Sequence, residues 1–111
     1  MRFMMFVASD SEPDGRPEAP GEVEAWVDDL DKRGKRVTGD RLQAARSART
    51  VRVRGGRKMV TDGPFAECKE VILGFDILEC DSLEEAIEIA AKHPMARAGR
   101  IEVRAFWPSE D

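Results

Sequence analysis

Two segments with a single apolar stripe at helical spacing, set among strand-like sequence, constrain the fold of this chain most. The apolar residues of the first are Val23, Trp26, Val27 and Leu30, a spacing that predicts a helix from Gly21 to Arg33. The second begins at a cap formed by Asp81 or Ser82 and stops at Pro94. Its predicted apolar face consists of Leu83, Ala86, Ile87, Ala90 and Ala91. Helices with one apolar face each cover one side of a sheet, so we expect both on the same side.

Most of the remaining sequence is typical of β-strands. The predicted strands are residues 1–8, residues 36–42 with an interruption at Gly39 and Asp40, residues 71–79 with Gly74 in the middle, and residues 101–105. Between the second and third of these, alternating valines and arginines flank Gly55-Gly56, which predicts a hairpin with a two-residue turn.

The order of these elements is strand, helix, strand, hairpin, strand, helix, strand. This order predicts one α+β domain over residues 1–111, a ferredoxin-like split βαβ fold with an extra β-hairpin. Its antiparallel sheet would carry two helices on one face and leave the other face bare. A second copy of the chain is the simplest cover, so we predict a homodimer.

The charge balance argues against a nucleic-acid partner. Eighteen basic and 22 acidic residues give a net charge of −4, whereas nucleic-acid-binding domains are usually basic. The charges are unevenly placed, because residues 41–61 contain seven cations and no acid, and residues 1–31 contain nine acids and two arginines. This polarity has three interpretations: a solvated arginine-rich hairpin, a surface that steers an anionic ligand, or two copies that dock basic part to acidic part.

The chain has no sequence signal for a membrane or for export. Its apolar runs are far shorter than the ~18 residues of a membrane span, and the apolar stretch of residues 1–8 is too short for a signal peptide. We therefore expect a cytoplasmic protein without a membrane partner. Cys68 and Cys80 are expected to be reduced thiols, with Cys80 buried ahead of the second helix.

Two residues are candidates for acid/base catalysis. His93 is the single histidine, and histidine is the side chain whose ordinary pKa lies nearest neutral pH. Its alternative role is structural, as a cap at a helix end. Asp62 is either a cleft acid that acts as a base, or a turn residue whose carboxylate bonds backbone amides across Gly63-Pro64.

Three basic residues are candidates for holding a small anionic substrate: Arg49 in the basic segment, Arg104 in the last strand and Lys69 in the loop after the turn. For Lys69, solvent exposure is the simpler interpretation. One histidine and scattered carboxylates give no zinc or calcium spacing, and Gly55-Gly56 lacks the strand-to-helix context of a phosphate loop. We therefore predict neither a metal nor a cofactor.

The region after the hairpin resembles a known family. The motif Asp62-Gly63-Pro64-Phe65-Ala66-Glu67 is followed by Lys69-Glu70, Gly74-Phe75, a helix rich in Glu and Ala, and Ile101-Glu102-Val103-Arg104. In residue type, order and spacing these resemble the DGPF proteins of the YCII-related family, over nearly the whole chain. The resemblance implies a dimeric α+β barrel, in which two ferredoxin-like sheets pack face to face around a cleft. Members are mostly bacterial, and the resemblance implies no settled reaction.

The chain departs from this family at two places. For the wider family, an enzymatic role has been inferred from a histidine in the first helix and an aspartate before a proline after the second. Here the predicted first helix contains no histidine, and the residue before Pro94 is His93. Acid/base chemistry would therefore rest on His93 with a new partner, or be absent.

Two hypotheses of function follow. The first is a metal-independent enzyme that acts on a small anionic organic molecule in the barrel cleft, with His93 and Asp62 moving protons. The second is a dimeric ligand-binding or accessory module without chemistry. A His93→Gln exchange distinguishes them, because loss of turnover with retained affinity indicates a proton carrier.

Overall fold

The computed structural model describes residues 1–15, 18–64 and 70–108. Along the chain the elements are β1 (Arg2–Ala8), α1 (Glu22–Lys32), β2 (Arg36–Arg41), the short 3-10 helix η1 (Ala45–Ser47), β3 (Arg49–Arg54), β4 (Arg57–Asp62), β5 (Ile72–Glu79), α2 (Leu83–Ala91), α3 (Met95–Ala98) and β6 (Arg100–Ala105). The predicted order is confirmed. The one-turn helix α3 and η1 are additions that the apolar pattern did not predict.

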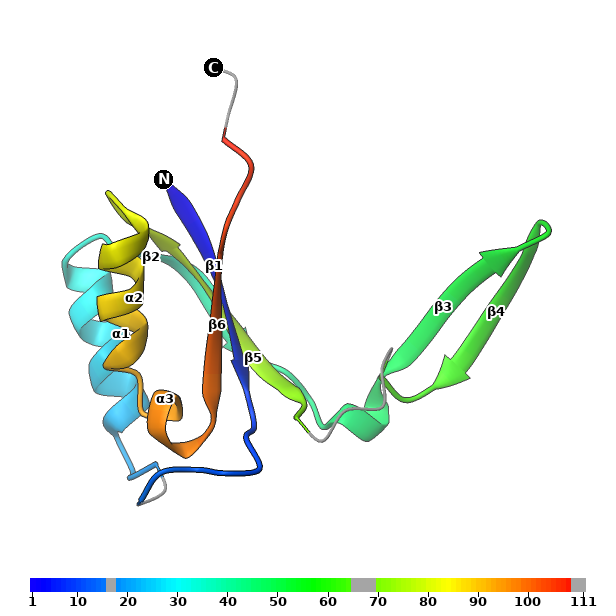
Figure 1. Cartoon of the computed structure of the whole chain (residues 1–111), viewed down its shortest axis with the longest axis horizontal. Helices are drawn as coiled ribbons and strands as arrows, with labels where there is room; N and C mark the ends of the chain where they lie inside the picture. Colours follow the sequence, from blue (N-terminus) through cyan, green and yellow to red (C-terminus); the bar gives the residue numbers. More distant parts are fainter. Residues whose placement is uncertain (16–17, 65–69, 109–111) are drawn as a thin grey trace.

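Four of the strands form an antiparallel sheet in the order β2-β5-β1-β6. Helices α1 and α2 lie together on one side of this sheet, and the β3–β4 hairpin extends away on the other side (Figure 1). The α+β fold with two helices on one face and an extra hairpin is therefore confirmed. Among the described helices, none is long and apolar enough to cross a membrane.

Two glycines let the strands β2 and β5 approach closely. A Cβ on Gly74 would lie 2.8 Å from the carbonyl oxygen of Asp40, so this position has room only for glycine. A Cβ on Gly39 would collide with the carboxylate of Asp76 and lie 2.7 Å from the carbonyl oxygen of Phe75. The β2–β5 register shifts between Arg36 and Thr38, whereas Gly39 and Asp40 pair in regular register with Asp76 and Phe75. The irregularity of this strand therefore lies before the predicted interruption at Gly39 and Asp40.

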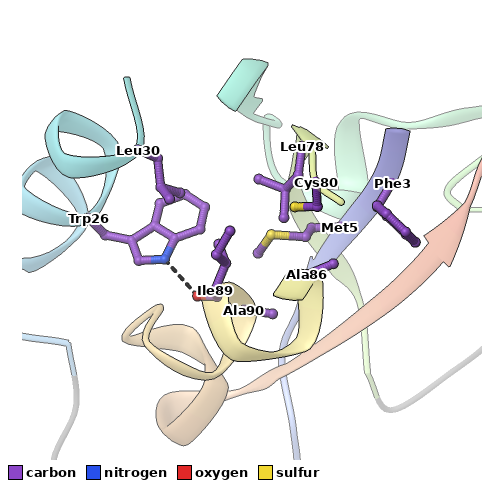
Figure 2. Packing of buried hydrophobic residues seen from close by; sticks show 9 residues of the cluster. All are labelled: Phe3, Met5, Trp26, Leu30, Leu78, Cys80, Ala86, Ile89 and Ala90. Carbon is purple, nitrogen blue, oxygen red and sulfur yellow. Dashed lines mark hydrogen bonds between the residues drawn. The ribbon is translucent and has the colours of Figure 1, made fainter. Parts of the chain in front are cut away.

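The core lies between the sheet and the two helices (Figure 2). Met5 of β1 and Leu78 of β5 point from the sheet toward the helices, and Phe3 of β1 belongs to the same buried cluster as Trp26 and Leu30 of α1. The remaining members of the cluster are Cys80, Ala86, Ile89 and Ala90. The indole Nε1 of Trp26 donates a hydrogen bond of 2.9 Å to the carbonyl oxygen of Ile89, which joins the two helices.

The predicted apolar face of α2 is only partly correct. Ala86 and Ala90 are buried as predicted, but Leu83 is 45% exposed and Ile87 is 50% exposed, whereas Ile89 is buried. The rotation of α2 follows its core contacts, because the peptide of Ile89 is held by Trp26. An apolar edge of α2 is therefore left uncovered.

The β3–β4 hairpin has the geometry that its sequence predicts. Gly55 and Gly56 have φ angles of 58° and 76°, the left-handed conformation that both positions of this turn require. All six residues of β4 are exposed, as are most of β3. The hairpin forms a separate two-stranded sheet that pairs with no strand of the main sheet among the described residues.

Candidate functional site

A pocket of about 450 Å³ lies at one end of the molecule between α1, the helix-covered face of the sheet and the connection from α2 to α3. Most of its walls are apolar. The apolar side chains of the lining include Val7, Val23, Val27, Leu42 and Met95. Two buried ionisable groups, Asp76 and His93, also line it. An apolar cavity with a few convergent polar groups is the usual form of a small-molecule site.

Asp76 reaches this pocket because it alternates with Gly74 and Leu78 onto the helix-covered face of β5. Only 6% of the surface of Asp76 is exposed to solvent. Its Oδ1 accepts a hydrogen bond of 2.8 Å from Nε of Arg36, which comes from β2. Burial raises the pKa of the Asp76 carboxyl above its ordinary value, and the Arg36 guanidinium offsets part of that increase. The carboxyl is thus anchored by a cation and made more basic by its surroundings.

His93 reaches the pocket from the end of α2 and is 5% exposed. Its Nδ1 accepts a hydrogen bond of 3.0 Å from the backbone N–H of Met95. Nδ1 therefore carries the lone pair in the neutral ring, and Nε2 carries the proton. Within the described part of the chain, Nε2 has no hydrogen-bond partner. The ring lies edge-on to Trp26, with 4.7 Å between the ring centroids.

Burial lowers the pKa of His93 to about 4. The expectation that this histidine titrates near neutral pH is therefore wrong, because the apolar surroundings disfavour the imidazolium. At pH 7 the ring is neutral and presents one N–H donor. The ring of His93 also has a structural role. Its Nδ1 accepts a hydrogen bond from the backbone N–H of Met95, the first residue of α3, whereas the predicted cap would have bonded carbonyl groups at the end of α2.

The formal charges around the pocket do not favour an anion. Arg36 and Arg41 supply two positive charges, whereas Glu18, Asp40 and Asp76 supply three negative ones. Arg36 is also engaged with two carboxylates, since its guanidinium lies 3.8 Å from Asp31 in addition to its bond with Asp76. The lining is therefore matched to a molecule without net negative charge.

An ion pair fixes the position of α3 beside the pocket. Both carboxylate oxygens of Glu22, the first residue of α1, accept hydrogen bonds of 2.6 and 2.7 Å from Arg97 of α3. Met95 and His93 lie on the segment that this pair holds. The pair thus links the two helical segments that form the pocket wall.

Of the predicted site residues that the structure describes, His93 lines this pocket, and Asp62, Arg49 and Arg104 do not. Asp62 and Arg49 lie at the base of the hairpin, where Nε of Arg49 is 3.2 Å from Oδ1 of Asp62, and the Asp62 side chain is 88% exposed. Arg104 pairs with Glu102 at 2.7 Å on β6, with its guanidinium over the ring of Phe6. Lys69 lies outside the described residues, as do Phe65, Ala66, Glu67 and Cys68 of the same loop.

Asp76 and Arg36 were missed by the sequence reasoning. A usable signal existed for Asp76, because it is the one charged residue within the apolar run from Val71 to Leu78, and a charge in a strand that reads as buried is more informative than a charge on a loop. Arg36 gave no comparable signal, since its pairing depends on the register of β2 with β5. Among the described residues no group of three or more His, Cys, Asp or Glu side chains is arranged to hold a metal ion.

Comparison with known proteins places this arrangement in context. An uncharacterised protein, R00369, from Rhizobium meliloti (strain 1021) is 48% identical over 50 residues, which are 45% of this chain and 40% of that protein. The solved structure of 5-chloro-2-hydroxyhydroquinone dehydrochlorinase (TftG) from Burkholderia phenoliruptrix AC1100, in complex with 2,5-dihydroxybenzoquinone, aligns with 99% of this chain and 97% of its own, at 16% identity and a TM-score of 0.45. The family model of the YCII-related domain matches residues 1–110, and the chain therefore belongs to the YCII-related family.

Proposed function

We propose that the pocket beside α1 binds a small, largely apolar organic molecule with a carbonyl group, and catalyses proton abstraction next to that carbonyl. The observation that carries this proposal is the presence of a buried carboxylate and a buried neutral imidazole in the lining of one apolar cavity. This combination provides a base and a hydrogen-bond donor without a metal.

Asp76 is the proposed base. Its carboxylate takes the proton from carbon, and the electron pair left behind moves onto the carbonyl oxygen of the ligand. The pKa of Asp76 is raised by burial, which makes the carboxylate a better proton acceptor than an exposed aspartate. Arg36 holds the carboxylate in place through Oδ1.

His93 is the proposed donor to the oxygen that becomes negative. Its Nδ1 is occupied by the N–H of Met95, so the proton on Nε2 is the one available to a ligand. A neutral imidazole is suited to this role, because its N–H can donate a hydrogen bond to the carbonyl oxygen of the ligand. Return of the proton to another atom of the ligand would complete an isomerisation and regenerate Asp76.

An uncharged ligand fits the pocket better than the small anion predicted from the basic segment. The lining carboxylates outnumber the lining arginines, and Arg49 and Arg104 lie elsewhere on the molecule. Acid/base chemistry is retained in this proposal, with Asp76 in the place that the sequence reasoning gave to Asp62.

The test is a screen for proton exchange. Carbonyl compounds that raise the thermal stability of the protein are incubated with it in D2O, and incorporation of deuterium at carbon is followed by mass spectrometry. We expect Asp76→Asn to abolish the exchange and to leave binding within about threefold. We expect His93→Phe, whose ring has no N–H, to slow the exchange by roughly 10²-fold, the scale of one lost donor.

Asp62→Asn is the matched control, because it removes a carboxylate that lies outside the pocket. Binding without exchange in the wild-type protein would support the alternative function, a ligand-binding module without chemistry. Exchange that persists in Asp76→Asn, or a ligand found at a site away from both Asp76 and His93, would overturn the assignment of the pocket.

The bare face of the sheet supports a homodimer. Met4, Phe6, Phe75 and Ile77 share the face opposite the helices and are each partly exposed. An antiparallel sheet with apolar residues on both faces needs a second cover. We infer that a second copy of the chain provides it, and sedimentation at micromolar concentration tests this directly.

A further inference from the structure

The β3–β4 hairpin cannot be stable as it stands in one copy. A lone two-stranded hairpin is marginal in water at best, and this one extends away from the sheet (Figure 1). The Cα radius of gyration is 16.1 Å, whereas a compact chain of this length has roughly 13 Å. Because the hairpin projects instead of packing, another surface is needed to hold it.

The hairpin has an apolar face and a high positive charge. Val51 and Val60 are direct cross-strand partners, and Val53 lies two residues along on the same face. All three side chains are at least half exposed. Five cations of residues 49–62 accompany one acid, Asp62. Arg52, Arg54 and Arg57 lie on the face opposite the valines. The valine face therefore fits an apolar surface.

The α2–β6 groove is such a surface. It has a volume of about 590 Å³ and is lined by Leu83 and Ile87 of α2 and by Ile101 and Val103 of β6. The two α2 residues are the ones that the sequence pattern assigns to the core and that the single copy leaves about half exposed. The charged residues of the groove, Asp10 and Arg100, pair with each other at 3.1 Å.

The sheet topology brings the hairpin and this groove together in a dimer. β2 and β6 are the two edges of the sheet, and the hairpin follows β2 in the chain. If two copies face each other through their bare sheet faces about a two-fold axis parallel to the strands, the β2 edge of each lies over the β6 edge of the other. The hairpin projects on that same side (Figure 1), alongside the second copy.

We propose that the β3–β4 hairpin is an exchange arm that docks into the α2–β6 groove of a second copy of the chain. The valine face of the arm covers Leu83 and Ile87, and Lys58, the cross-strand partner of Val53, lies on the same face of the arm. This inference rests on the homodimer proposed above and adds the β3–β4 hairpin to the contacts between its two copies.

Site-specific crosslinking tests the contact. Val53→Cys and Ile87→Cys are made in separate chains on a Cys68→Ser background, mixed after mild denaturation and refolding, and treated with a short bismaleimide. Cys80 is 2% exposed and does not compete. We expect a covalent dimer from this mixture. Ala25→Cys, exposed on α1 away from the groove, replaces Ile87→Cys in the matched control and is expected to give none.

A second measurement uses the wild-type surface. The arm contains Arg52, Arg54, Arg57 and Lys58, which are cleavage sites for trypsin when the arm is free. We expect the wild-type arm to resist cleavage. Ile87→Glu should expose it and raise the dissociation constant of the dimer by about tenfold or more, because a charge then replaces an apolar contact. Ala25→Glu, with the same added charge on α1, should leave both readouts unchanged.

The results separate the arm from the dimer. A stable dimer without crosslinking at residue 87, or with an arm that trypsin cleaves in the wild-type protein, would overturn the arm contact and leave the dimer standing. A monomer in sedimentation would overturn both. Circular dichroism of Ile87→Glu checks that the variant is folded, which is expected because Ile87 is half exposed within one copy.

Discussion

Acid should destabilise this protein through His93, and the size of the effect follows from its burial. The folded state takes up a proton at His93 only near pH 4, whereas the unfolded chain does so near 6.5. Between these values the unfolded state binds more protons, so the free energy of unfolding falls as the pH is lowered. At 1.36 kcal/mol per pKa unit, the loss between pH 7 and pH 5 is roughly 2 kcal/mol.

Urea unfolding of the wild-type protein and His93→Gln at pH 7, 6 and 5, at one protein concentration, isolates this contribution. Glutamine keeps an acceptor for the N–H of Met95 and cannot titrate. Asp76, whose raised pKa acts in the opposite direction, is present in both proteins and cancels in the difference. We expect the wild-type protein to lose about 2 kcal/mol more than the variant. Parallel pH dependences for the two proteins would refute a buried, neutral His93.

Three further substitutions test the pocket and the core by urea unfolding. Gly39→Ala places a methyl group against Asp76 and should cost about 1–3 kcal/mol; an unchanged midpoint would contradict the close packing of β2 on β5. Arg36→Gln should cost about 3 kcal/mol, the low end for a broken buried pair, because 17% of the arginine side chain is exposed. Without its cation the pKa of Asp76 rises further, so this variant should lose additional stability as the pH rises above the ordinary aspartate value; a flat profile would count against the pair. Trp26→Phe removes one of two donors to the carbonyl of Ile89, which also accepts from the backbone N–H of Lys92 at 3.2 Å, and should cost about 1 kcal/mol; a neutral result would mean that the bond between the helices contributes nothing.

Much of the fold was predictable because it depends on local patterns. The stripe of α1, the alternation in β6 and the paired glycines of the hairpin turn each report a local periodicity or conformation that the structure confirms. Gly74 in the middle of a predicted strand indicated either a bulge or a close backbone neighbour, and the structure shows the carbonyl of Asp40 beside it.

The site was less predictable because it depends on register and burial. Asp76 and Arg36 are 40 residues apart in the chain and meet only through the shifted pairing of β2 with β5. His93 was identified by its chemistry, but its lowered pKa follows from tertiary packing that no spacing reports. The uncovered edge of α2 escaped prediction because a helical pattern reports apolar residues without stating which of them a single copy covers.

The most direct test of the proposed site is ¹⁵N NMR of the one histidine side chain, recorded at pH 7 before and after addition of a carbonyl compound found by thermal shift. His93 is the single histidine of the chain, so its ring signals need no assignment. We expect a neutral ring protonated at Nε2, with Nε2 shifting on binding in the wild-type protein. A charged ring, a ring protonated at Nδ1, or a bound compound that leaves both nitrogens unchanged would contradict the site.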